Sequence, residues 1–125
     1  MYTLQPAGLV CRAALPKEIQ CARIAELRGA LVASGLTTLD QQAAALGLGR
    51  STCWQICRAA HKGSGLSASI IARMLSSPTL PPAARHVIFR YLDEKSRGLY
   101  GHHPRHIQRF QARLQSLHPP IRLAS

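Results

Sequence analysis

The chain has 125 residues, of which 16 are lysine or arginine and five are aspartate or glutamate, so its formal net charge at pH 7 is +11. That length fits one compact domain with modest tails and a real hydrophobic core. The charge exceeds what solubility requires and indicates a polyanionic partner, but charge alone does not distinguish DNA, RNA and an anionic membrane.

The apolar run near the start, Ala7–Leu15, is interrupted by Arg12 and has no basic segment before it. This pattern is typical of neither a signal peptide nor a spanning helix, so we expect a cytoplasmic protein without a membrane partner. Without a secretion signal, we expect its cysteines to be reduced thiols rather than disulfides. They are Cys11, Cys21, Cys53 and Cys57.

Residues 1–15 show no sustained hydrophobic period, and we expect a flexible N-terminal arm there. A helix follows over residues 18–34, because Pro16 suits a first turn and Gly35 is a typical stop. Its inner side is predicted from apolar residues at helical spacing. They are Cys21, Ile24, Leu27, Leu31 and Val32.

Two short helices separated by a glycine turn are expected next. Thr38 is suited to cap a helix over Leu39–Leu46, and Gly47 is the residue type that ends a helix in the left-handed conformation. A third helix then opens at Arg50 or Ser51 and runs to about residue 60.

Two more helices are marked by their first residues. Ser67 can cap a helix over residues 68–75, and Pro82 stands at the first position of a helix that runs to Arg97. Both repeat apolar residues at helical spacing. The expected buried residues are Ile71, Met74, Leu75, Ala84, Val87, Ile88, Tyr91 and Leu92.

The last expected helix, Pro104–Leu117, is amphipathic, with an apolar stripe and an arginine stripe on roughly opposite sides. We expect the apolar stripe to pack on the core or on a second copy. The arginines are either a solvated face or contacts to phosphates. The two stripes are Ile107, Phe110, Leu114 and Leu117, and Arg105, Arg109 and Arg113.

No alternating apolar pattern is long enough for a strand, and no internal repeat occurs. The sequence therefore predicts an all-α fold, a compact bundle of five to six short helices. We divide it into an arm (residues 1–15), a main helical domain (residues 16–97) and a C-terminal amphipathic helix with a tail (residues 98–125).

The pair of helices around Gly47 meets the requirements of a helix-turn-helix. Ala43 is small enough for the helices to approach closely, and Gly47 makes the turn. Apolar residues occupy the inner positions, and an outer set on the second helix has the same i, i+3, i+4, i+7 spacing. The inner residues are Leu46, Leu48, Cys53, Ile56, Cys57 and Ala60, and the outer ones are Ser51, Trp54, Gln55 and Arg58.

The outer set carries the groups that read base edges. Glutamine pairs with adenine through two hydrogen bonds and arginine with guanine, while serine or threonine bonds to bases or phosphates. Arg50 adds a second long donor at the start of the helix. Trp54 either stacks against the DNA backbone or covers the neighbouring loop as a half-buried aromatic.

The segment Thr38–Arg58 resembles the helix-turn-helix of phage repressor and Cro-type regulators, with Ala43, Gly47 and Ile56 at key positions. Residues 47–52 also resemble the turn and recognition-helix start of lac-repressor-type headpieces, and residues 62–75 are similar to the loop and helix that follow there. Gln42 departs from this pattern, since these families usually have an apolar residue at that position.

The resemblance implies a lambda-repressor-like fold in which residues 16–97 form a DNA-binding domain. Its second motif helix would enter the major groove of double-stranded DNA, with dimers spanning two half-sites. It thus implies a homodimeric, sequence-specific regulator of transcription, a repressor in type. Because no sugar-binding domain follows, no small-molecule effector is expected. The implied DNA contacts are Thr38, Arg50, Ser51, Thr52, Trp54, Gln55, Arg58 and Lys62.

Two other functions remain open on the same residues. One is a non-specific architectural or RNA-binding protein that uses the same charge. The other is a protein-interaction module, such as an antitoxin or adaptor, whose exposed stripe binds a partner helix. Binding to random DNA, to RNA and at high salt separates these from a specific regulator.

We expect no enzyme, cofactor or metal site. The five acidic residues are scattered and offer no acid–base pair, and no phosphate-binding glycine loop is present. Cys53, Cys57 and His61 follow i, i+4, i+8 spacing, but both thiols lie on the inward stripe, where a small apolar residue is expected. The histidines at 102, 103 and 106 lack a paired Cys-x-x-Cys motif.

Overall fold

The computed structural model describes residues 15–58, 65–117 and 120–121. Within these residues it contains six α-helices and no strand, which confirms the predicted all-α bundle. None of the described helices is long and apolar enough to cross a membrane. The helices are α2 (Pro16–Ala33), α3 (Leu39–Leu46), α4 (Arg50–Arg58), α5 (Ala68–Leu75), α6 (Pro82–Ser96) and α7 (Pro104–Ser116).

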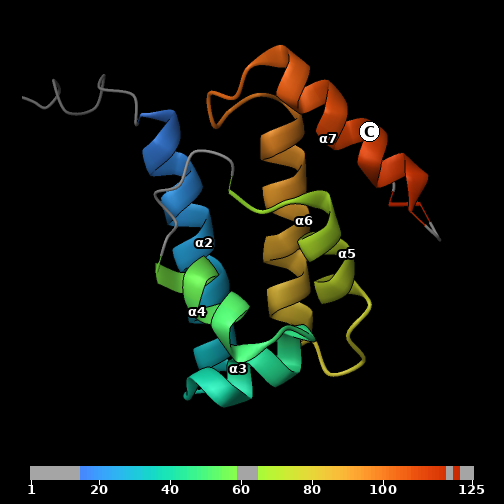
Figure 1. Cartoon of the computed structure of the whole chain (residues 1–125). Coiled ribbons are helices and arrows are strands. Elements are labelled where there is room, and N and C mark those ends of the chain that lie inside the picture. Colours follow the sequence, from blue (N-terminus) through green and yellow to red (C-terminus); the bar gives the residue numbers. More distant parts are fainter. Residues whose placement is uncertain (1–14, 59–64, 118–119, 122–125) are drawn as a thin grey trace, which may run out of the picture.

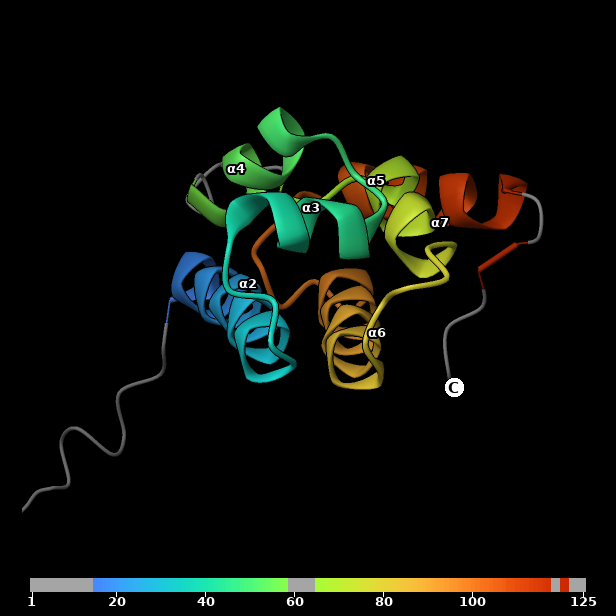
Figure 2. The ribbon, with the colours of Figure 1, turned by 90° about the horizontal axis from the view of Figure 1, so that it is seen from below.

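The helices form two layers around one core. The two longest, α2 and α6, lie antiparallel and side by side (Figure 1). The other four, α3, α4, α5 and α7, form the second layer over them (Figure 2). Phe110 and Leu114 of α7 are buried in this core, and Leu117 packs against it. Most of the apolar stripe of the last helix is therefore covered within the chain, with Ile107 half-buried, and α7 shares the core of residues 16–97.

The buried side of α2 differs from the prediction at three positions. Val32 was expected inside but is 44% exposed, because it is rotated by about 100° from Leu31, which faces the core. Gln20 is buried, although it is polar, and Cys21 is only half-buried. The other predicted residues of this helix, and those of α5 and α6, lie in or against the core as expected.

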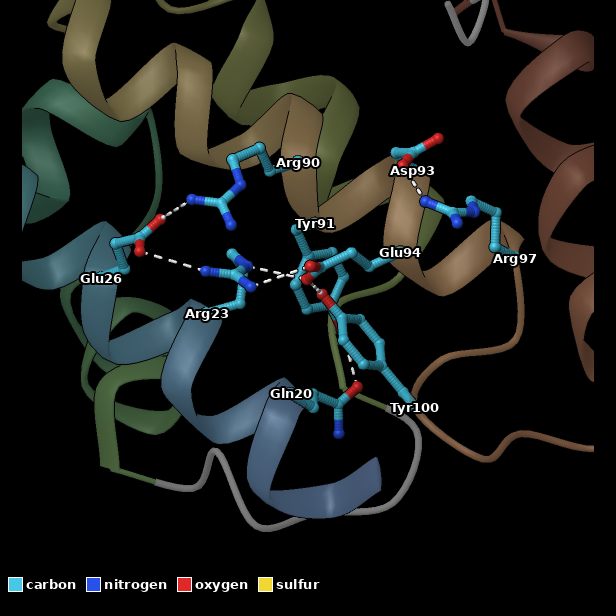
Figure 3. A network of polar contacts seen from close by, with 9 residues as sticks. All are labelled: Gln20, Arg23, Glu26, Arg90, Tyr91, Asp93, Glu94, Arg97 and Tyr100. Atoms are coloured by element: carbon cyan, nitrogen blue, oxygen red, sulfur yellow. Dashed lines mark hydrogen bonds and ion pairs between the residues drawn. The ribbon is translucent and has the colours of Figure 1, made fainter. Parts of the chain in front are cut away.

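Polar contacts hold α2 to α6 (Figure 3). The Arg23 guanidinium donates to both carboxylate oxygens of Glu94, at 2.7 and 2.8 Å, and to Glu26 at 3.1 Å. The Tyr100 hydroxyl also donates to Glu94, at 2.8 Å, and Arg90 donates to Glu26 at 3.0 Å. Because the Arg23 and Glu94 side chains are only 12% and 15% exposed, this network fixes the register of the two helices.

A buried polar cluster fixes the start of α5 on this layer. The Leu66 N–H donates to the Tyr91 hydroxyl at 2.7 Å, and that hydroxyl donates to Gln20 Oε1 at 3.0 Å. The Lys95 ammonium donates to the Leu66 carbonyl at 2.7 Å and lies 4.4 Å from the ring centre of Phe110. Lys95 is only 1% exposed and is therefore part of the core. Hydrophobic periodicity does not predict this, because lysine is a charged residue.

Candidate functional site

The start of α3 is closed by a reciprocal pair of hydrogen bonds. Thr38 Oγ1 accepts from the Gln41 N–H at 3.1 Å, and Gln41 Oε1 accepts from the Thr38 N–H at 3.1 Å. The predicted cap at Thr38 is therefore confirmed. The cap uses a lone pair of the exposed hydroxyl, whose proton can still be donated to an outside acceptor.

A glycine turn joins α3 to α4. Gly47 has φ 69°, and the N–H of Leu48 bonds back to the Ala43 carbonyl at 3.0 Å. A Cβ at Gly47 would lie 3.3 Å from the Arg73 carbonyl oxygen and 3.3 Å from Ser77 Cβ. Both the left-handed backbone and the space beside α5 therefore favour glycine at this turn.

Gln42 is buried, 3% exposed, at the position where an apolar residue was expected. Its side-chain amide donates to the Leu36 carbonyl at 2.9 Å, in the connection between α2 and α3. The polar group is therefore satisfied inside the domain, and the departure at this position does not prevent α3 from packing.

The inner face of α4 holds the helix on the core. Cys53 is fully buried, Ile56 packs against the core and Cys57 is half-buried, so these three inward predictions are confirmed. Leu46 and Leu48 are buried beside them, also as predicted. Ala60, the last residue of the predicted set, lies outside the described residues.

The two thiols of α4 interact with each other. The Cys53 thiol is hydrogen-bonded to Cys57 and lowers the pKa of Cys57 below its usual value, and the charge of Arg28 acts in the same direction. The same bond, together with burial, raises the pKa of Cys53 well above its usual value. No cluster of three or more possible metal ligands occurs among the described residues, which do not include His61.

The outer face of α4 carries most of the predicted contact residues. Ser51, Gln55 and Arg58 are exposed, Trp54 is 50% exposed, and Thr52 is half-buried at the edge. The Arg58 guanidinium lies over the Trp54 ring, 4.9 Å from its centre. A shallow depression on this face is lined by Leu39, Arg50, Ser51, Trp54 and Gln55.

Six of the eight predicted residues thus share one short helix, and Thr38 lies at the start of the helix before it. The eighth, Lys62, lies outside the described residues. Asp40 is a further residue of this site that sequence reasoning missed. Its carboxylate pairs with Arg50 at 3.1 Å, and both side chains are largely exposed, at 76% and 70%.

The charges divide unequally between the two layers. Helices α2 and α6 carry four of the five carboxylates of the chain, and the fifth is Asp40 of α3. Helices α3, α4, α5 and α7 together carry six arginines against that single carboxylate, so their layer is strongly cationic. These arginines are Arg50, Arg58, Arg73, Arg105, Arg109 and Arg113.

Comparison with known protein families, with curated proteins and with solved structures finds no match. The function is therefore inferred from the residues of the chain themselves. What they provide is a short helix with a buried thiol side and an exposed polar, cationic side, in a layer with one carboxylate.

Proposed function

We propose that this chain is a sequence-specific double-stranded DNA-binding protein that regulates transcription as a repressor, with α3 and α4 acting as a helix-turn-helix. One observation carries the proposal. The exposed side of α4 presents Gln55 and Arg58, while Cys53 on its opposite side is fully buried and anchors the helix.

Base readout is assigned to the outer face of α4. The Gln55 amide offers one donor and one acceptor, the pair that adenine requires in the major groove. Arg50 and Arg58 each offer the two parallel donors that guanine requires, and Ser51 can bond to a base or a phosphate. Because the inner face of the helix is packed, these groups are presented from a fixed backbone.

Phosphate contacts are assigned to Thr38 and Lys62. Thr38 has a hydroxyl proton free to donate at the N-terminus of α3, where the helix dipole favours an anion. Lys62 is proposed as a second phosphate contact on the sequence pattern alone. The resemblance to repressors further supports a homodimer on two half-sites, which the stoichiometry of the DNA complex tests.

Gln55→Ala tests base readout directly, with His86→Ala, an exposed polar side chain on α6 in the opposite layer, as the control. We expect Gln55→Ala to cost about 1–3 kcal/mol of binding free energy on a selected duplex and little on a scrambled one. Arg50→Ala should behave in the same way, whereas Lys62→Ala should weaken both duplexes similarly. Equal losses on both duplexes for Gln55→Ala would remove its assignment as a reader.

A further inference from the structure

We propose that α7 forms a second, sequence-independent contact to the phosphate backbone of duplex DNA through Arg105, Arg109 and Arg113. The inference rests on the proposed DNA-binding function and extends the bound surface beyond α3 and α4. Three properties of α7 carry it: an unpaired arginine stripe, its position in the fold, and the absence of a large exposed apolar side chain.

The three arginines are exposed and follow one another at every fourth residue, while Phe110 and Leu114 are buried on the other side of α7. The helix contains no acidic residue, and no carboxylate of the described residues lies within ion-pair distance of these arginines. The stripe spans about 12 Å, a length over which one DNA strand carries about three phosphates.

Helix α7, which carries this stripe, lies in the same layer as α4 (Figure 2). Helix α4 packs on α2 and α3, and α7 packs on α5 and α6. Figure 2 shows both helices in the layer opposite α2 and α6. We therefore propose that a duplex lying across α4 continues over α7 in this layer.

The remaining residues of the exposed face favour a polyanion over a protein or a lipid surface. Gln108, Ala112 and Gln115 are exposed between the arginines, whereas the large apolar residues of α7 are buried or half-buried. A protein interface requires a buried aromatic or aliphatic anchor, and an interfacial membrane helix requires an apolar face that enters the lipid. The exposed side of α7 offers neither.

The test is the salt dependence of DNA binding by the full chain, since each phosphate contact releases counterions. The variant is Arg105→Gln/Arg109→Gln/Arg113→Gln, which keeps good helix formers at exposed positions. The control, Lys17→Gln/Arg90→Gln/Arg97→Gln, removes the same charge from exposed positions on α2, within α6 and directly after α6. Circular dichroism melting checks that both variants fold.

We expect the α7 variant to flatten the slope of log affinity against log salt by about 2 to 3, equally on selected and scrambled duplex DNA. The control should change this slope by no more than about 1, the value expected for one phosphate contact. Equal slopes for the α7 variant and the control, or a loss confined to RNA, would overturn the inference.

Failure of the proposed function gives a different result. In that case wild type does not prefer the selected duplex to the scrambled one, whatever the slope of the α7 variant. A preserved preference with an unchanged slope rejects the α7 contact alone, so the two hypotheses are separated by the same titrations.

Discussion

Arg50 is paired with the Asp40 carboxylate, so in the proposed complex DNA competes with this carboxylate for the guanidinium. The Asp40 carboxylate lies 3.1 Å from the guanidinium, at a face proposed to approach phosphates. An exposed pair of this kind is weak, so Arg50 can be released on binding, but the acid remains as a repulsive charge next to the duplex.

Replacing Asp40 with asparagine should therefore strengthen DNA binding by about two- to fivefold at low salt. The matched control is Asp93→Asn, which breaks the pair with Arg97 on α6 and changes the net charge by the same amount. Fluorescence anisotropy titrations with both variants measure the effect. An equal gain for the two variants would indicate a general charge effect and not a contact at Asp40.

The polar residues inside the core could not be predicted from the sequence. Gln20, Gln42 and Lys95 are each at most 3% exposed. The partners of Gln42 and Lys95 are backbone carbonyls of Leu36 and Leu66, outside their own helices. Hydrophobic periodicity cannot predict such buried polar residues, because their hydrogen-bond partners are distant in the sequence or lie in loops. The apolar inner face and the polar outer face of α4, in contrast, were predicted from residue spacing alone.

At the scale of elements, the turn between α3 and α4 is the feature with the clearest stereochemical requirement. Gly47 has φ 69° and little space for a Cβ, whereas nothing lies within 4 Å of a Cβ added at Gly49. We expect Gly47→Ala to lower the free energy of unfolding by about 1–2 kcal/mol and Gly49→Ala to change it by less than about 0.5 kcal/mol. Urea unfolding measures both, and similar losses would contradict this role of the turn.

The helices themselves were largely predictable because their ends carry local signals. The caps at Thr38 and Ser67 and the prolines at 82 and 104 fix where helices begin, and each cap hydroxyl accepts the expected N–H. The prediction that Val32 is buried was wrong, because an apolar residue at the edge of a stripe is buried only if a neighbouring helix covers it. That depends on how α2 is placed and not on its sequence.

At the scale of the whole molecule, Lys95 links the two layers and makes stability depend on pH. Burial lowers the pKa of its ammonium to about 8, from 10.5 in the unfolded chain. Below pH 8 the folded state keeps a buried charge at a cost, and this cost disappears as the ammonium loses its proton. Folding stability from this group therefore rises with pH through the window from about 8 to 10.5.

Lys95→Met should abolish this dependence, with Lys17→Met as the exposed control. Relative to Lys95→Met, the unfolding free energy of wild type should rise by about 1–3 kcal/mol between pH 7 and 10. The range ends at pH 10 because Tyr91 and Tyr100, whose pKa values burial raises, oppose the effect above it. A constant difference between wild type and the variant over this range would show that Lys95 does not titrate there.

The division of charge between the layers could not be predicted from the sequence. Net charge is a property of composition, but the gathering of four carboxylates on α2 and α6 becomes a surface property only once those helices pair. The same pairing leaves α4 and α7 in the layer with a single acid. This arrangement places the proposed reading face on α4 and the proposed backbone contact on α7 in one cationic layer.

The central claim is that the outer face of α4 reads bases, and selection of bound duplexes from a random pool tests it most directly. We expect wild type to enrich a two-fold symmetric consensus, and Gln55→Ala to lose the preference at one position in each half while keeping the rest. Recovery of no consensus by wild type, or of the same consensus by Gln55→Ala, would contradict the account.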